Sequence, residues 1–390
     1  MLVSRRRARS RLPSYTCPAR SRRNGSRGRV PAGRDPTVRA HASLASPTVG
    51  ACLRSAVAVD TARDGFVTGQ SAVARTRPPH RYLHDALLYD SPAELVDIAA
   101  PWLLEGLAAG DAAVVATSAA TADVLRDAVG GEPRVHVLER GDVYRARTPT
   151  AITTFRSLAE QRAAEGISRV RVVGEVDFGP TERDWLEWQR YESVINEALG
   201  GWPLWGLCVF DTQRLPDPLL ESALRTHSHV LDGDGGRAPN PQFTEPAAYL
   251  RSLPVPREPL EETVPRLEAG DVADFIGLRH AVAAELGTVD APRDLVEDFL
   301  LAVDEMTSNA VRHGGPPVSL RLWVGGDRVV CTIRDRGPGF DDPFAGYGPA
   351  HGDDLSRGGM GLWLARQLCD HVDISAGEHG VAVRLTVRLG

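Results

Sequence analysis

The sequence predicts two consecutive domains of different class: an α/β domain with a mostly parallel sheet, then an α+β domain with helices on one sheet face. Three observations predict this order. In the first half, short apolar runs alternate with helical patterns. A Gly- and Pro-rich stretch follows, with Asp232-Gly-Asp-Gly-Gly236 and seven prolines from Pro239 to Pro265. In the last third, two helical patterns precede mostly hairpin-connected strand patterns.

Residues 1–78 are rich in Arg, Ser, Ala, Pro and Gly and show no sustained hydrophobic period. Such a composition cannot bury enough apolar surface to offset the entropy of ordering, so we expect a disordered tail. The tail holds 16 Arg and three Asp, a net charge of +13, and the remaining residues therefore carry −19 of the total of −6. The alternatives are a basic arm for nucleic acid or acidic membrane, an organelle transit peptide, and a start site assigned too far upstream.

The composition excludes several classes of function. All 45 basic residues are arginine, which removes Schiff-base chemistry and the lysine of a P-loop. The acidic folded part argues against direct nucleic-acid binding, and charges interrupt every long apolar stretch, so we expect no membrane partner. Five cysteines without a Cys-x-x-Cys pair indicate a reducing, cytoplasmic location.

The α/β domain is expected at residues 79–231. Its first strand, at 86–89, is followed by Ser91-Pro92-Ala93-Glu94, a capping box with proline at the first helical position. The helix that begins there extends to about residue 109, and Gly110 ends it. Further strands are expected at 112–117, 134–138, 170–173 and 204–210, with helices at about 119–129, 150–165 and 182–199.

Residues 232–266 are interpreted as a linker and residues 267–390 as the α+β domain. In that domain we expect helices at about 271–286 and 292–312, and then strands at about 317–324 and 328–335. A Gly-rich loop, a helix at 362–369 and strands near 372–376 and 381–389 complete the chain.

The second of these helices carries Glu305, Asn309 and His313 at a spacing of four, so the three side chains share one helix face. An Asn amide oxygen is a hard donor suited to Mg²⁺, which shares phosphate oxygens with its protein ligands. A Glu one turn away can accept a proton from an attacking hydroxyl. The alternative is a solvated polar stripe on an amphipathic helix.

Asp335 ends an apolar strand and is followed by Gly337 and Gly339. A carboxylate at this position can accept a hydrogen bond from an exocyclic amine such as that of adenine, and glycines let the backbone approach a flat base. The alternative is a simple turn, because Asp, Gly and Pro are turn residues.

Gly358, Gly359 and Gly361 immediately precede the helix that begins at Leu362. Backbone N–H groups in such a loop, with the positive end of the helix dipole, form a phosphate site. The alternative is a flexible, glycine-rich hinge. The Asp- and Gly-rich stretch between Gly339 and Gly358 is interpreted as a lid over a nucleotide.

The three segments occur in the strings LAVDEMTSNAVRHGG, DRGPGFDDP and GGMGLWLARQLCD. In order and spacing they resemble the N, G1 and G2 boxes of the GHKL (Bergerat-type) ATPases, and look closest to the anti-sigma-factor serine kinase branch. The resemblance implies an α+β sandwich that binds ATP and Mg²⁺, with Glu305 as catalytic base, Asn309 as Mg²⁺ ligand and Asp335 as adenine anchor. It also implies ATP-binding roles for the glycines and Leu362. One departure is Gly380-Val381, where the family often has Gly-Thr.

In the first domain, His84-Asp-Ala-Leu-Leu-Tyr89, Glu105-Gly106-Leu107-x-x-Gly110 and Arg171-Val-Val-Gly-Glu175 resemble the MEDS sensory domain of bacterial signalling proteins. The resemblance implies a small-ligand sensor, with His84 and Tyr89 as candidate ligand contacts. The alternative for both is packing at a strand. Without Gly-x-x-x-x-Gly-Lys, no catalysis is assigned to this domain.

The combined expectation is a cytoplasmic bacterial regulator: a sensory domain controls an ATP-dependent serine/threonine kinase that acts as an anti-sigma factor. Its partners would be an anti-anti-sigma factor and a sigma factor, and a homodimer is left open. One alternative is a nucleotide-gated binding module without turnover. The other is a sensor histidine kinase, but His280, the one upstream candidate on a predicted helix, lacks the following acidic residue and is interpreted as structural.

Overall fold

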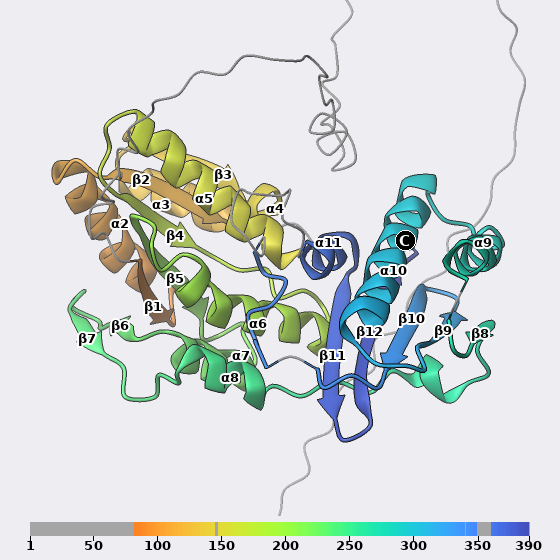
Figure 1. Ribbon diagram of the computed structural model, residues 1–390. Helices are drawn as coiled ribbons and strands as arrows, with labels where there is room; N and C mark the ends of the chain where they lie inside the picture. Colours follow the sequence, from red (N-terminus) through yellow and green to blue (C-terminus); the bar gives the residue numbers. More distant parts are fainter. Residues whose placement is uncertain (1–81, 145–146, 273, 340, 349–359, 390) are drawn as a thin grey trace, which may run out of the picture. The chain divides into compact units, whose positions relative to one another are not determined.

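The structure, a computed structural model, describes residues 82–144, 147–272, 274–339, 341–348 and 360–389 (Figure 1). The tail expected at residues 1–78 lies outside the described residues. So do Gly358 and Gly359, together with most of the stretch interpreted as a lid.

The first sheet is seven-stranded in the order β3-β2-β4-β5-β1-β6-β7 (Figure 1). Its strands are β1 (Leu83–Tyr89), β2 (Ala112–Thr117), β3 (Val135–Glu139), β4 (Val170–Gly174), β5 (Leu204–Asp211), β6 (His229–Leu231) and β7 (Arg237–Pro239). Every pairing is parallel except that of β6 with β7. The predicted α/β class with a mostly parallel sheet is confirmed.

Helices cover both faces of this sheet, because each central strand is apolar on both sides. One core joins α2 (Pro92–Ala108) and α3 (Ala119–Ala128) to side chains such as Leu87 and Val115. The other joins α5 (Thr148–Ala164), α6 (Glu182–Ala198) and α7 (Asp217–Thr226) to side chains such as Ala86 and Val114. A short helix, α4 (Arg140–Val143), follows β3. The sheet is therefore the middle of three layers.

The expected capping box forms at the start of α2. The Ser91 hydroxyl accepts a hydrogen bond from the Glu94 N–H, and the Glu94 carboxylate accepts one from the Asp90 N–H. Gly110, just after the helix, has a φ of 86°. Such a left-handed conformation favours glycine, so the helix ends where the sequence predicts.

The second sheet is five-stranded and antiparallel in the order β11-β12-β10-β9-β8 (Figure 1). Its strands are β8 (Leu267–Ala269), β9 (Ser319–Val324), β10 (Arg328–Asp335), β11 (His371–Gly377) and β12 (Gly380–Arg388). Helices α9 (Phe275–Leu286), α10 (Arg293–His313) and α11 (Gly361–Leu368) bury their apolar sides against it in one core. The predicted α+β sandwich is confirmed.

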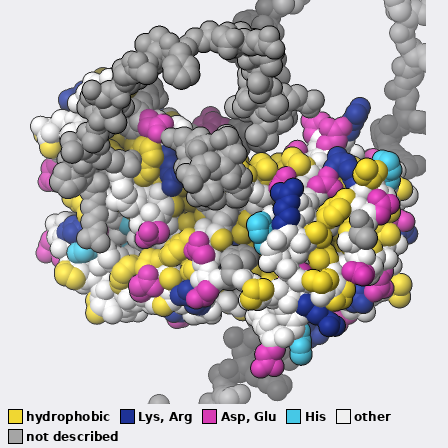
Figure 2. All heavy atoms as spheres, viewed as in Figure 1, with side chains coloured by type: hydrophobic (Ala, Val, Ile, Leu, Met, Phe, Trp, Pro, Cys, Tyr) yellow, Lys and Arg dark blue, Asp and Glu magenta, His cyan; other side chains and the backbone are white. Residues whose placement is uncertain are grey.

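The stretch interpreted as a linker, residues 232–266, contains regular structure. Strand β7 pairs with β6 in the first sheet, and α8 (Pro246–Ser252) and the 3₁₀ helix at Pro259–Glu262 follow. Among the described residues, no helix combines the length and apolar character needed to span a bilayer. On the face drawn in Figure 2, Arg side chains lie among acidic and hydrophobic side chains.

Candidate nucleotide site

Helix α10 carries two of the predicted site residues on the edge of its buried face. Phe299, Val303 and Met306 dock the helix in the core, each at most 2% exposed. Glu305 and Asn309 are half-buried and lie one helical turn apart. Because the apolar side chains fix the rotation of the helix, both polar side chains are held in a defined direction.

Asp335 is the last residue of β10, and its carboxylate is 8% exposed. Its Oδ1 atom accepts a hydrogen bond of 2.7 Å from the Gly337 N–H. A Cβ on Gly337 would lie 2.6 Å from the Cα of Gly314, so only glycine fits this close approach. No described residue donates a hydrogen bond to the Asp335 Oδ2 atom, which leaves one carboxylate oxygen for an external donor.

Gly361 brings the start of α11 against α10. A Cβ at this position would lie 2.8 Å from the Glu305 Oε2 atom and 2.9 Å from the Asn309 Nδ2 atom. Both distances are shorter than ordinary van der Waals contact. The absence of a side chain at Gly361 therefore permits the two polar groups of α10 to meet the N-terminus of α11.

These elements enclose a cavity of about 320 Å³. Four predicted site residues line it: Asn309, Asp335, Gly339 and Leu362. Its wall is otherwise mainly apolar, with Met306, Ala310, His313, Gly314, Ile333, Ala345, Ile374, Val381 and Val383. Three predicted site residues are not among the lining residues: Gly337 contacts Asp335, Gly361 contacts Asn309, and Glu305 contacts Gly361. Three segments that are far apart in sequence thus meet around one apolar cavity with a carboxylate and an amide on its wall, which suits a flat base.

Residues 269–387 match the family model of the histidine kinase-like ATPase domain, and residues 83–228 match that of the MEDS (MEthanogen/methylotroph, DcmR Sensory) domain. Serine-protein kinase RsbW of Bacillus velezensis is 32% identical over 145 residues, which are 34% of this chain and 82% of the relative. Its Bacillus subtilis counterpart is 32% identical over 151 residues, 36% of this chain and 85% of the relative. This chain belongs to the RsbW kinase family. Serine-protein kinase RsbW of Staphylococcus aureus is 28% identical over 127 residues, 29% of this chain and 79% of the relative.

The match of residues 269–387 and the RsbW relatives confirm the resemblance to the GHKL kinase branch. The match of residues 83–228 confirms that this RsbW-family chain has a MEDS domain. The matched relatives align with about a third of the chain. The residues that line the cavity lie between positions 306 and 383, inside the matched ATPase domain.

In the MEDS domain of this RsbW-family chain, the structure does not bring the two sensory candidates together. His84 and Tyr89 are five residues apart on β1, so their side chains point to opposite faces of the sheet. Tyr89 is 6% exposed, and burial raises its pKa to about 12. It packs in the core beside α2 and α3.

His84 instead meets three side chains that sequence reasoning missed: Glu192 on α6, Cys208 on β5, and His227 just after α7. All four are buried. Burial raises the pKa of Glu192 to about 7 and lowers the pKa values of His84 to about 4 and of His227 to about 3. Their separations in sequence match no short motif, so no signal in the chain could have identified them as a group.

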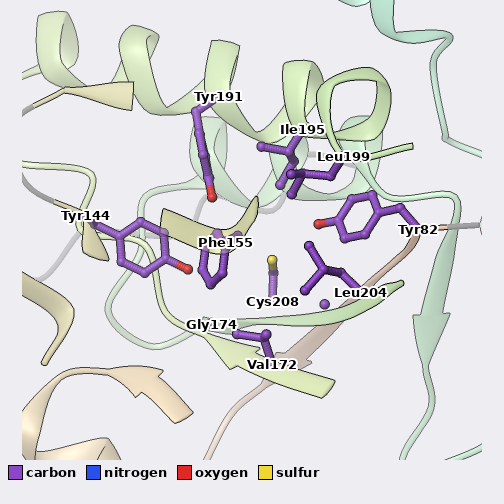
Figure 3. Close-up of a pocket in the computed structure, with 11 residues that line it drawn as sticks. Tyr82, Tyr144, Phe155, Val172, Gly174, Tyr191, Ile195, Leu199, Leu204 and Cys208 are labelled. Atoms are coloured by element: carbon purple, nitrogen blue, oxygen red, sulfur yellow. The ribbon is translucent and has the colours of Figure 1, made fainter. Parts of the chain in front are cut away.

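A small apolar cavity lies beside this group. Figure 3 shows Tyr82, Tyr144 and Tyr191 around it, with the Cys208 sulfur at its wall. A Cβ on Gly174 would lie 2.7 Å from the Tyr144 hydroxyl oxygen, and one on Gly206 would lie 3.1 Å from the Tyr82 hydroxyl oxygen. The two glycines in the sheet therefore make room for the tyrosine hydroxyls.

Proposed function

We propose that this chain is an ATP-dependent serine/threonine protein kinase that acts as an anti-sigma factor. Its substrate is an anti-anti-sigma factor, its second protein partner is a sigma factor, and the MEDS domain controls it in response to a small ligand. The observation that carries the proposal is the meeting of α10, the end of β10 and the start of α11 around one cavity.

At one end of this cavity the residues fit an adenine ring. Ile333, Ile374 and Val383 offer apolar surface to a flat base. The Asp335 Oδ2 atom can accept a hydrogen bond from the exocyclic amine, while Oδ1 is held by the Gly337 N–H. A base with a carbonyl group in place of the amine would place a hydrogen-bond acceptor against the Asp335 carboxylate, which is also an acceptor. The site should therefore favour ATP over GTP.

The other end fits the phosphates and their metal. Asn309 would hold Mg²⁺ through its amide oxygen. The first N–H groups of α11 have no intrahelical partners and can donate to phosphate oxygens, and Gly361 and Leu362 stand at this terminus. When bound, ATP and Mg²⁺ supply the phosphoryl group and neutralise its charge.

Glu305 would act as the general base. It is adjacent to Asn309 and to the start of α11, next to where phosphates would bind. From there its carboxylate can accept the proton of a serine or threonine hydroxyl as that oxygen attacks. The roles of all these residues, and of Gly339, Gly358 and Gly359 in binding ATP, are part of the proposal.

The test is transfer of labelled phosphate from ATP to a cognate anti-anti-sigma factor. Wild type should label a serine or threonine, and Glu305→Ala should lose activity by about 100-fold or more, as expected for removal of a general base. Glu297→Ala, on the same helix and outside the site, is the matched control. No transfer by wild type, or undiminished transfer by Glu305→Ala, would reject the catalytic assignment.

The same assay separates the alternatives. ATP-dependent retention of a sigma factor without transfer would select a nucleotide-gated binding module. Acid-labile autophosphorylation that is lost in His280→Ala would select a histidine kinase. His280 lies on α9 with an exposed side chain.

A further inference from the structure

Four buried side chains of the MEDS domain converge on one point. The ligand atoms of His84, Glu192, Cys208 and His227 all lie within 4.8 Å of one another. The His84 Nε2 atom is 3.2 Å from the Glu192 Oε2 atom and 3.3 Å from the Cys208 Sγ atom. The His227 Nε2 atom is 3.4 Å from the Glu192 Oε2 atom. None of the four side chains belongs to the proposed kinase site.

The protonation of His84 is fixed by its neighbour Asn196. The two N–H groups of the Asn196 amide donate to backbone carbonyl groups, one of them to Thr226 and the other shared between Glu192 and Ser193, at 3.0–3.2 Å. Its Oδ1 atom is therefore the acceptor that faces the His84 Nδ1 atom at 3.2 Å. Since an amide oxygen can only accept, His84 carries its proton on Nδ1 and turns the lone pair of Nε2 toward the cluster.

The protonation of His227 is fixed in the same way. Its Nδ1 atom is 2.7 Å from the backbone carbonyl oxygen of Ala223, which can only accept. His227 therefore also carries its proton on Nδ1 and presents a lone pair from Nε2. Two imidazole lone pairs and a carboxylate therefore face one another in the buried interior of the domain.

This arrangement lacks donors. The Cys208 thiol has one proton to donate, either to the His84 Nε2 atom or to the Glu192 carboxylate, and the His227 Nε2 atom has no hydrogen-bond partner among the described residues. Glu192 is 1% exposed and His227 0%. Leaving such groups unpaired is costly, so a cluster of acceptors of this kind needs a cation, a shared proton or a buried water among them.

We propose that His84, Glu192, Cys208 and His227 bind a divalent transition-metal ion, with Zn²⁺ as the best match to this donor set. A tetrahedral Zn²⁺ site with bonds of about 2.0–2.3 Å separates its ligand atoms by roughly 3.3–3.8 Å. The observed separations of 3.2, 3.3 and 3.4 Å are close to this range. Asn196 and the Ala223 carbonyl group then orient the two imidazole rings, as the outer shell of metal sites does.

The surroundings suit a metal ion that is held inside the domain. The ligands come from β1, α6, β5 and the end of α7, so one ion would join two neighbouring strands to two of the helices on this face. Cys208 also lines the apolar cavity of Figure 3.

The experiment measures metal content and metal chemistry in the full chain. After expression with added Zn²⁺ and exhaustive desalting, elemental analysis should find about one zinc per wild-type chain, as for a closed four-ligand site. Replacement by Co²⁺ should produce a thiolate-to-cobalt charge-transfer band. Cys208→Ser should abolish that band, and Glu192→Gln should weaken Zn²⁺ binding at least about 10- to 100-fold, the loss that outer-shell changes already cause.

Two controls keep the result specific. His229→Gln changes a histidine of the same domain that bonds to Ser228 outside the cluster, and Cys331→Ser changes a buried cysteine of the ATPase domain. Both should retain zinc and the cobalt band. Wild type without bound metal, or a cobalt band that survives Cys208→Ser, would overturn the proposal and leave a network held by a proton on Glu192. Kinase activity plays no part in either readout.

Discussion

Replacement of Asp335 by Asn tests the proposed adenine pocket with a small change of side chain. Asn has the shape of Asp and can keep the hydrogen bond from the Gly337 N–H through its own oxygen. Its amide nitrogen would then occupy the place of the Asp335 Oδ2 atom and present a donor to the amine of the base, which is also a donor. The substitution therefore replaces an acceptor by a donor where the base would bind, and it keeps the hydrogen bond that holds the turn at Gly337.

The magnitude follows from the type of bond. A hydrogen bond to a charged group contributes about 1.5–3 kcal/mol, and the carboxylate is only 8% exposed, so little water replaces it. The expected loss of ATP affinity is therefore roughly 10- to 150-fold. The free energy of unfolding should change by less than about 1–2 kcal/mol, because the hydrogen bond to the Gly337 N–H is retained.

Isothermal titration of ATP in the presence of Mg²⁺ measures the effect, with chemical denaturation as the check on stability. Asp327→Asn is the matched control, since Asp327 lies at the other end of β10 with an exposed carboxylate. Wild type should also bind ATP more tightly than GTP, and Asp335→Asn should reduce that preference. Equal ATP affinity in wild type and Asp335→Asn, with both proteins folded, would refute the assignment of this cavity to adenine.

We expect four further experimental results for the ATPase domain. Gly361→Ala places a Cβ 2.8 Å from the Glu305 Oε2 atom and should lower the rate of phosphotransfer about 10- to 100-fold without loss of stability. Its control is Gly326→Ala, which has open space around the new Cβ and should leave the rate unchanged in the same assay. Val381→Thr adds a hydroxyl at the cavity wall and should tighten ATP binding by about 0.5–1.5 kcal/mol in titration; weaker binding would contradict this geometry. Phe299→Ala removes a fully buried ring and should cost about 3–5 kcal/mol in denaturant unfolding. Burial raises the pKa of the Cys331 thiol, so mass mapping should find it unalkylated at pH 8 until the protein unfolds.

The elements that local patterns specify were predicted within a few residues. The strand at 112–117 has the expected limits, and the helix with Glu305 and Asn309 extends over residues 293–313 instead of 292–312. The ten-residue helix α7 was missed, and so were several short elements: β6 and β7, for example, have three residues each, and α8 lies among prolines. Three-residue strands carry too little periodicity to be predicted. They form because β1 has a free edge on which β6 pairs, and β6 in turn pairs with β7.

The two candidate sites differ in how much of them the sequence contains. In the ATPase domain, each segment concentrates several site residues within a few positions, so chemistry could be assigned to Asp335 and its glycines before their meeting was known. In the MEDS domain, each ligand stands alone on its own element. The sequence analysis singled out His84. It could not single out Glu192, which is one of several glutamates on a predicted helix, or Cys208, which lies in an apolar run that predicts a buried strand.

The four side chains of the MEDS domain are brought together by the order of the strands in the sheet, which local sequence does not specify. The chain returns from β5 to lie beside β1, with His84 opposite Gly206 and Ala86 opposite Cys208. Cys208 and His84 therefore share a face, two positions apart, and Gly206 leaves the space between them without a side chain. A Cβ there would lie 3.7 Å from the His84 ring but 3.1 Å from the Tyr82 hydroxyl oxygen. That glycine thus sets how closely the tyrosine packs on the strand without crowding the histidine, so the cluster and the cavity depend on the same strand pairing.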